Sequence, residues 1–207
     1  IMRAIFGVDK YDSGEVLVDG KKLHGGNPAA AISDGIGFCT EDRKKEGLAL
    51  RLSILLNMTL VRLPFLSKIG VINRRAQRAA ADEYMKAISI KAPSVYQLVG
   101  NLSGGNQQKV VVAKWLNADA DVYIFDEPTK GVDVGAKQEI FHLINEIAKQ
   151  GHCVIYATCE NSELLSITDR MYVMFDGQVM AELETAKTSE DEIMHYATGA
   201  TTEFVAG

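Results

Sequence analysis

The segment from Asn101 to Thr129 limits the possible folds more than any other part of this sequence. It contains the run Leu-Ser-Gly-Gly and, 23 positions after Ser103, an Asp-Glu pair that follows four largely apolar residues, Val122 to Phe125. An apolar run of this length is typical of a buried strand, and the interval before it has room for one helix and a short loop. The segment therefore predicts a helix and then a strand that ends in acidic residues, as in an α/β fold.

The acidic pair Asp126-Glu127 is expected where ligands bind in open α/β sheets, at the carboxyl end of a buried strand. In phosphoryl transfer, an acid such as Asp126 at this position holds Mg²⁺, and the metal neutralises charge on the β- and γ-phosphates. Glu127 is then the candidate catalytic residue that orients or polarises the attacking water. The alternative is an acidic pair that merely ends a strand, but Pro128-Thr129 after it and the glycines upstream favour a site.

The run Ser103-Gly104-Gly105 is expected to open a helix that continues over 107–116. Unpaired backbone N–H groups and the helix dipole make such a helix start an anion site. Glycines let the backbone approach a phosphate because no Cβ is in the way, and Ser103 adds a hydroxyl donor. The alternative is an N-cap followed by a flexible turn, which explains Ser103 but not the paired glycines.

Strand-like and helix-like segments alternate along most of the chain. Asp19-Gly20 and Asp176-Gly177 are hairpin turn signals, and Asn27-Pro28 is a helix start signal. The expected hairpins span 14–23 and 170–183, the expected buried strands 36–40, 121–125 and 153–158, and the further helices 27–34, 135–150 and 162–167. This alternation predicts an α/β fold with a mainly parallel sheet that is covered on both faces.

Residues 52–98 are expected to form a helical subdomain within a single domain that covers 1–207. The longest apolar stretch, Ile54 to Leu66, is interrupted by Asn57, Arg62 and Pro64 and is too short to span a bilayer. Its apolar residues exceed what a thin helical layer needs, so we expect them to include a docking surface for membrane subunits. The alternative is that they pack on the sheet domain.

Composition excludes several classes of protein. The net charge of -5 argues against nucleic acid as the main partner, because binding to a phosphate backbone requires excess Lys and Arg. The three cysteines include no Cys-x-x-Cys pair, which argues against a disulfide framework and a zinc site. Cys39 and Cys153 lie in apolar, strand-like runs and are expected to be buried thiols in a reducing cytosol.

The motifs together resemble those of ABC-type ATPases. Leu102 to Lys109 resembles the signature motif, Val122 to Thr129 the Walker B motif, and Gly131-Val132-Asp133 the D-loop. The Glu41-Asp42-Arg43-Lys44 stretch and the block from Asp126 to Lys137 narrow the resemblance to the second half of bacterial monosaccharide importer ATPases of the ribose, galactose and xylose type. The resemblance implies a P-loop NTPase-like mainly parallel sheet, an antiparallel β subdomain and an inserted α-helical ABC subdomain.

The sequence contains no Gly-x-x-x-x-Gly-Lys-Ser/Thr run, the loop that cradles phosphates in P-loop proteins. In the family, a helix-like segment such as the one at Ile1 directly follows that loop. The resemblance therefore implies that Ile1 lies just past the Walker A position of a longer protein, and that the isolated chain has negligible ATPase activity.

The resemblance also assigns residues to ATP and Mg²⁺. Asp126 is the implied metal ligand and Glu127 the implied catalytic residue. The signature would contact ATP held by an opposing domain. The implied ATP-binding residues are Leu102, Ser103, Gly104, Gly105, Gln107, Glu41, Asp133 and Cys159. Glu41 stands where the family usually has the Q-loop glutamine, and Cys159 where it usually has the switch histidine. Both changes should weaken hydrolysis in this domain's own site.

The implied partners are an N-terminal ABC half of the same polypeptide, transmembrane permease subunits and, indirectly, a sugar-binding protein; no nucleic acid is expected. The implied location is the cytoplasmic face of the cell membrane, as a peripheral protein. Two other functions stay open. One is a degenerate, non-catalytic ABC half that serves as an interaction module. The other is a chromosome- or repair-type ABC ATPase, which the short helical insert and the acidic balance disfavour.

Overall fold

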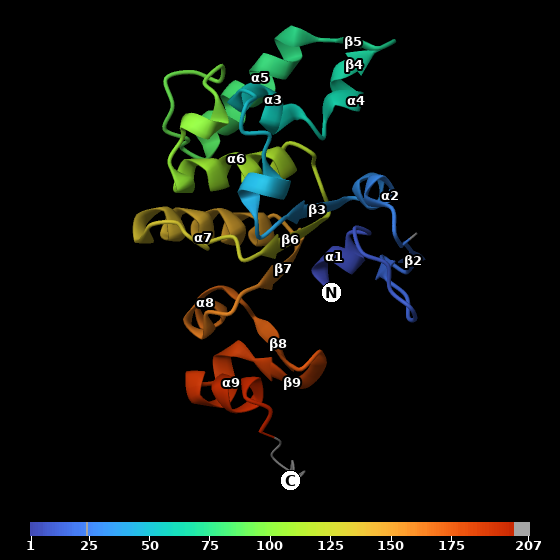
Figure 1. Cartoon of the computed structure of the whole chain (residues 1–207), viewed down its shortest axis with the longest axis vertical. Helices are drawn as coiled ribbons and strands as arrows, with labels where there is room; N and C mark the ends of the chain where they lie inside the picture. Colours follow the sequence, from blue (N-terminus) through green and yellow to red (C-terminus); the bar gives the residue numbers. More distant parts are fainter. Residues whose placement is uncertain (24, 201–207) are drawn as a thin grey trace. The chain divides into compact units, whose positions relative to one another are not determined.

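A computed structural model describes residues 1–23 and 25–200 (Figure 1). The chain divides into two compact units, Ile1–Ala157 and Thr158–Gly207. The predicted single nucleotide-binding domain over 1–207 stays a prediction, and its last seven residues, 201–207, lie outside the described part.

The first unit is built around a parallel sheet of three strands in the order β3-β6-β7. These strands are β3 (Ile36–Cys39), β6 (Val122–Asp126) and β7 (Cys153–Ala157). All four residues of β3 and the middle of β6 are buried, as their apolar runs predict. Because the strands are parallel, β3 and β6 end at the same edge of the sheet, with Cys39 paired to Phe125.

Two long helices pack against this sheet (Figure 1). Helix α6 (Gly104–Leu116) packs on β3, and residues 107–115 are all buried. Helix α7 (Val134–Lys149) packs on β7 through an amphipathic stripe that includes Ile140, Ile144 and Ile147. Both helices follow the sequence prediction closely. The mixed α/β architecture with a parallel sheet is the predicted fold class.

The cysteine predictions are half right. Cys39 is buried in β3, and burial raises the pKa of its thiol to about 12. Cys153 is exposed, so the prediction of a buried thiol is wrong there. The apolar run around Cys153 is a strand, but the residue is the first of β7, which pairs only with β6 among the described strands of the sheet. An end position on an edge strand leaves a side chain open to solvent.

The first residues of the chain form short elements. Helix α1 (Met2–Ile5) precedes the antiparallel hairpin of β1 (Leu17–Val18) and β2 (Lys21–Lys22), which turns at Asp19-Gly20 as predicted. The Asn27 side chain accepts hydrogen bonds from two backbone N–H groups and caps α2 (Pro28–Ser33). After β3, a π-helical turn, η1 (Arg43–Gly47), carries the charged stretch that distinguishes the resemblance to sugar importers.

The insert between β3 and α6 is mainly helical. It contains α3 (Ile54–Thr59), α4 (Leu63–Leu66) and α5 (Arg74–Ala87), and the helix η2 (Val99–Asn101) follows it. The sequence analysis missed a hairpin of β4 (Ser67–Lys68) and β5 (Val71–Ile72), because each strand has only two residues. Within residues 1–23 and 25–200, no helix combines the length and the apolar character that a membrane crossing needs.

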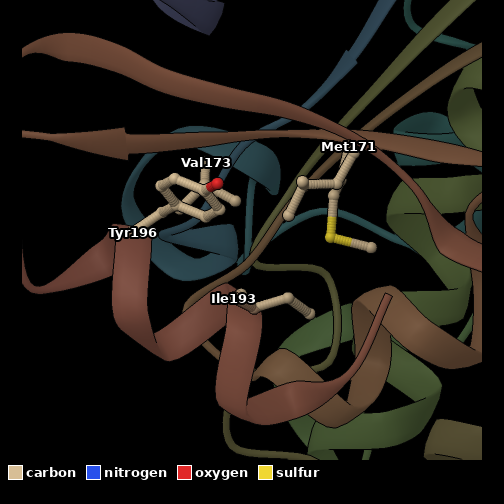
Figure 2. Close-up of a cluster of buried hydrophobic side chains, with 5 residues drawn as sticks. Met171, Val173, Ile193 and Tyr196 are labelled. Carbon is tan, nitrogen blue, oxygen red and sulfur yellow. The ribbon is translucent and has the colours of Figure 1, made fainter. Parts of the chain in front are cut away.

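The second unit contains α8 (Asn161–Ile167), the hairpin of β8 (Arg170–Phe175) and β9 (Gln178–Glu184), the turn η3 (Thr185–Lys187) and α9 (Glu190–Ala197). Its core joins one face of the hairpin to α9. Met171 and Val173 of β8 face Ile193 and Tyr196 of α9 (Figure 2). The sequence analysis did not predict α9, although Ser189 caps it and acids fill its first turn.

Candidate functional site

The acidic pair lies at the end of β6, as predicted. Asp126 is the last residue of the strand and Glu127 follows in a left-handed backbone conformation, with φ of 48°. The Glu127 N–H donates to the Ala157 carbonyl of β7 at 2.9 Å, which holds the turn to the neighbouring strand. A glutamate in this region of φ is uncommon, and backbone conformations of this kind concentrate at functional sites.

Carboxylates gather around Asp126. Its partial burial, and then the negative charges of Glu41 and Glu127, raise the pKa of Asp126 above its ordinary value. Glu41 comes from the end of β3, two residues past the strand, so the parallel register brings it to this edge. A bound cation would relieve this repulsion. Among the described residues, no group of three or more His, Cys, Asp or Glu side chains is arranged to hold a metal.

Glu41 has a second neighbour. Its Oε1 lies 2.6 Å from Nζ of Lys130, and both side chains are more than half exposed. An exposed pair of this kind contributes at most about 1 kcal/mol to stability. The pair nevertheless ties the loop after β3 to the segment that follows Glu127.

The predicted signature forms the start of α6. Ser103 is the N-cap, and its Oγ accepts from the Asn106 N–H at 3.4 Å and from Asn106 Nδ2 at 3.0 Å. Ser103 is exposed, so its hydroxyl lies at the surface at the start of a 13-residue helix, whose first backbone N–H groups have no carbonyl partner within the helix. This arrangement has the donors that an anion needs.

The two signature glycines have close neighbours inside the chain. A Cβ at Gly104 would lie 3.0 Å from Nη2 of Arg43 and 3.2 Å from the Gly131 carbonyl oxygen. A Cβ at Gly105 would lie only 2.6 Å from the Cβ of Ala136, at the start of α7. Real Cβ atoms almost never approach so closely. The glycines therefore permit close packing of loops and helix starts, a requirement that the sequence analysis did not foresee.

Two predicted ATP-binding residues point inward. Leu102 is buried, and Gln107 is 5% exposed with Nε2 donating to the carbonyls of Val99 and Leu102, each at 3.3 Å. A direct contact of these side chains with a nucleotide does not fit this placement. Helix α6 turns Gln107 toward η2, because that side of the helix packs beneath the insert, so the residue stabilises the loop that leads into Ser103.

Lys109, at the end of the signature segment, joins several parts of the first unit, a role that the sequence motif does not indicate. Its side chain is 3% exposed, and Nζ lies 2.5 Å from Oε2 of Glu139 on α7 and 3.0 Å from the carbonyl oxygen of Ser89. One ammonium group therefore joins α6, α7 and the loop after α5. The sequence carried a signal for this, since a lysine within a largely apolar helix requires partners when it is buried.

The predicted D-loop leads into α7. Asp133 is exposed and caps this helix, with Oδ1 accepting from the Ala136 N–H at 3.0 Å. Gly131 has a φ of 68°, a left-handed conformation that favours glycine. The contacts at Gly104 and Gly105 bring this segment beside the start of α6. Ser103 and Asp133 therefore belong to neighbouring helix starts.

Cys159, the remaining predicted ATP-binding residue, belongs to the second unit, two residues past β7. Its thiol is exposed. Contact with a nucleotide stays a prediction for this residue, as it does for Glu41, Ser103, Gly104, Gly105 and Asp133.

Comparison with known families decides what kind of protein carries these features. The family described as ABC transporter matches residues 1–130, more than half of the chain. The chain belongs to the ABC transporter family. The match includes α6, β6 and the acidic pair, whereas Asp133 and Cys159 lie outside the matched residues.

Relatives and solved structures agree with this membership. The chain is 44% identical over 200 residues to "Putative ribose/galactose/methyl galactoside import ATP-binding protein 1" of Agrobacterium fabrum, and 46% identical over 199 residues to "Ribose import ATP-binding protein RbsA" of Halalkalibacterium halodurans. Each alignment covers 96% of this chain but 40% of the relative. The chain thus spans about two fifths of the length of these ABC proteins.

Solved structures show the same ABC fold at low identity. A nucleotide-free ATP-binding cassette from an ABC transporter has a TM-score of 0.74 at 23% identity and covers 95% of this chain and 78% of its own. The dimeric post-hydrolysis state of the cassette MJ0796 bound to ADP and Pi has a TM-score of 0.73 at 23% identity, covering 89% of this chain and 78% of its own. The predicted P-loop NTPase-like fold class is confirmed.

Proposed function

We propose that this chain is the C-terminal nucleotide-binding half of an ATPase that energises import of a monosaccharide. One observation carries the proposal: the N-terminus of α6, capped by the exposed Ser103, lies beside the D-loop that begins α7. Such a surface suits the γ-phosphate of a nucleotide held by another domain. The relatives named as ribose and galactose importers support the class of substrate.

Asp126 and Glu127 are the residues at the sheet edge that would serve Mg²⁺ and ATP. Asp126 is partly buried at the end of β6; this burial, and then the negative charges of Glu41 and Glu127, raise its pKa, and a bound cation would offset the repulsion between the carboxylates. Asp126 would hold the metal, and Glu127 beside it would accept a hydrogen bond from a water molecule and orient it. When bound, Mg²⁺ would neutralise negative charge on the phosphates, whose γ-phosphorus is the electrophile of the reaction. Ser103 and the first N–H groups of α6 would bind phosphate oxygens of the opposing site.

The proposal assigns unequal roles to two parts of the chain, the signature at the start of α6 and the acidic pair at the end of β6. The start of α6 offers the exposed Ser103 hydroxyl, whereas Glu41, beside the acidic pair, stands at the family's glutamine position and Cys159, in the second unit, stands at the family's histidine position. A carboxylate cannot donate as an amide does, and a thiol is a weak donor beside imidazole. The main contribution of this half is therefore its signature, offered in trans to ATP on an N-terminal half of the same polypeptide.

The insert supplies a surface for the other partners. Leu60, Phe65, Ile69 and Val71 are at least half exposed, an apolar surface that suits docking to transmembrane permease subunits at the cytoplasmic face of the membrane. Selection of the sugar would rest on the permease and on a sugar-binding protein. A DNA-directed ABC ATPase is disfavoured by the net charge of -5.

A pair of substitutions in the full-length ATPase tests the asymmetry. Ser103→Arg places a bulky cation on the exposed start of α6, and we expect it to stop transport and to lower ATP turnover by at least about 100-fold, as misplacement at a reacting centre does. Glu127→Gln should be milder. Both variants are measured for uptake and phosphate release, with the isolated chain as a control that should turn over negligibly.

Three outcomes would contradict parts of this proposal. A more damaging Glu127→Gln variant would reverse the asymmetry between the two sites. Full activity of Ser103→Arg, with ATP still binding, would favour the non-catalytic interaction module. Substantial turnover by the isolated chain, abolished by Glu127→Gln, would show that this half hydrolyses ATP by itself.

A further inference from the structure

Arg43 connects three loops of the site. It is the first residue of η1, after β3, and its guanidinium reaches the segment before α7. Nη1 donates to the Lys130 carbonyl at 2.8 Å, and Nη2 donates to the Gly131 carbonyl at 3.4 Å. Nη2 is also the atom that lies 3.0 Å from where a Cβ of Gly104 would stand. One side chain thus contacts the D-loop backbone and the start of the signature helix.

The geometry of these contacts requires arginine. A guanidinium is a planar fork of donors and can bond two successive carbonyl groups at once, whereas a lysine ammonium is a single point charge on a flexible stem. The left-handed turn at Gly131 leaves the carbonyls of Lys130 and Gly131 accessible to the same fork. Nε of Arg43 is buried and has no hydrogen-bond partner among the described residues, so the two terminal nitrogens of the guanidinium make its hydrogen bonds.

The neighbouring contacts fix the same two segments. Lys130, whose carbonyl accepts from Arg43, also extends its ammonium to Glu41, from the loop that carries Arg43. Ala136, six residues after Lys130, packs closely against Gly105. Between these two contacts lies Asp133, the N-cap of α7. The position of Asp133 relative to Ser103 therefore depends on Arg43 at one side and on Ala136 at the other.

We propose that Arg43 is a positioning residue that holds the D-loop against the signature, so that Ser103 and Asp133 are presented at a fixed spacing to ATP in the opposing site. This role rests on the function proposed above. A positioning role for Arg43 predicts an effect on ATP turnover rather than on nucleotide binding. The reason is that Ser103 and Asp133 would act on a phosphate that residues of the opposing site already bind.

The test uses the full-length ATPase with Arg43→Ala and Arg43→Lys. We expect turnover at saturating ATP to fall by at least about tenfold in both variants, while KM for ATP changes by less than about twofold. Free guanidinium ion at a non-denaturing concentration should restore part of the activity of Arg43→Ala, because it can refill the site and donate to both carbonyls. It should not restore Arg43→Lys. Lys44→Ala, the exposed neighbouring cation, is the matched control and should keep full turnover.

Amide hydrogen exchange separates positioning from general damage. Arg43→Ala should lose protection over residues 130–136 and keep it in β6 and in the middle of α6, and its unfolding temperature should stay close to that of the wild type. Unchanged exchange over 130–136, or unchanged turnover despite altered exchange, would overturn the role of Arg43. A wild-type protein without ATP turnover would instead overturn the proposed function, and this role with it.

Discussion

The edge of the parallel sheet and the outer end of the helical insert expose different chemistry. At the edge, exposed polar groups such as Ser103 and Asp133 lie on loops that are tied together by Arg43 and by close glycine contacts. The outer end, residues 63–72, exposes several large apolar side chains beside the charged Lys68; Phe65 is 82% and Ile69 95% exposed. A fixed array of polar groups suits a small anion, whereas an exposed apolar surface suits another protein.

The exposed apolar side chains at the outer end do not mean that the insert is poorly packed. Its base is held by buried polar contacts: the Asn57 side chain bonds both the N–H and the carbonyl of Ala49, at 2.8 and 3.1 Å. Gln77 of α5 donates to Thr59 of α3 at 2.8 Å, and Asn117, the C-cap of α6, donates to the Met58 carbonyl at 2.9 Å. The insert is therefore anchored firmly to α6 while its outer end remains exposed, an arrangement suited to transmitting contact with a partner toward the signature helix.

The largest effect is expected at the sheet edge, from Gly105→Val. The new Cβ would overlap Ala136, whose own Cβ is anchored to the backbone and cannot turn away, and we expect a loss of about 3 kcal/mol in the free energy of unfolding. Denaturant unfolding of the chain measures it. Gly105→Ala is the milder form, and Ala136→Gly should recover part of its loss. If the losses from Gly105→Ala and Ala136→Gly simply add, the contact does not explain the glycine.

An intermediate effect is expected from Lys109→Met, which keeps the apolar stem but removes the ammonium between Glu139 and Ser89. We expect a loss of about 1.5–3 kcal/mol, typical of hydrogen bonds to a charged group. Lys149→Met is the matched control, because its pair with Glu146 is exposed and should contribute less than about 0.5 kcal/mol. Equal losses in the two variants would remove the distinction between the buried and the exposed ion pair.

The smallest effect on stability is expected at the outer end of the insert, from Ile69→Asn. Ile69 has a φ of 53°, which asparagine tolerates better than a β-branched residue, so the free energy of unfolding should change by less than about 0.5 kcal/mol or rise slightly. Co-purification with the permease subunits should nevertheless fall, as it should for Leu60→Glu. Val179→Thr, at another exposed apolar position, is the control. Unchanged co-purification and uptake in the first two variants would exclude this surface as the docking site.

Local patterns were sufficient for much of the fold. The apolar run before Asp126, the Ser103 and Asn27 caps, the amphipathic stripe of α7 and the Asp-Gly hairpin turns all depend on residues within a few positions of one another. The structure has each of these elements close to the predicted bounds. Elements that the sequence analysis missed, such as β4 and β5, are too short to establish a period.

The sequence by itself therefore determined most of the main helices and strands and which chemical groups end at the sheet edge, because helix caps, turns and apolar periods are properties of neighbouring residues. Only the tertiary structure decided which distant groups each signature residue contacts. Arg43 and Lys130 are 87 positions apart, so no local pattern links them. The same holds for the neighbours that require Gly104 and Gly105, and for the inward turn of Gln107. These contacts depend on how closely segments that are far apart in the sequence pack together, and the packing of the core sets that distance.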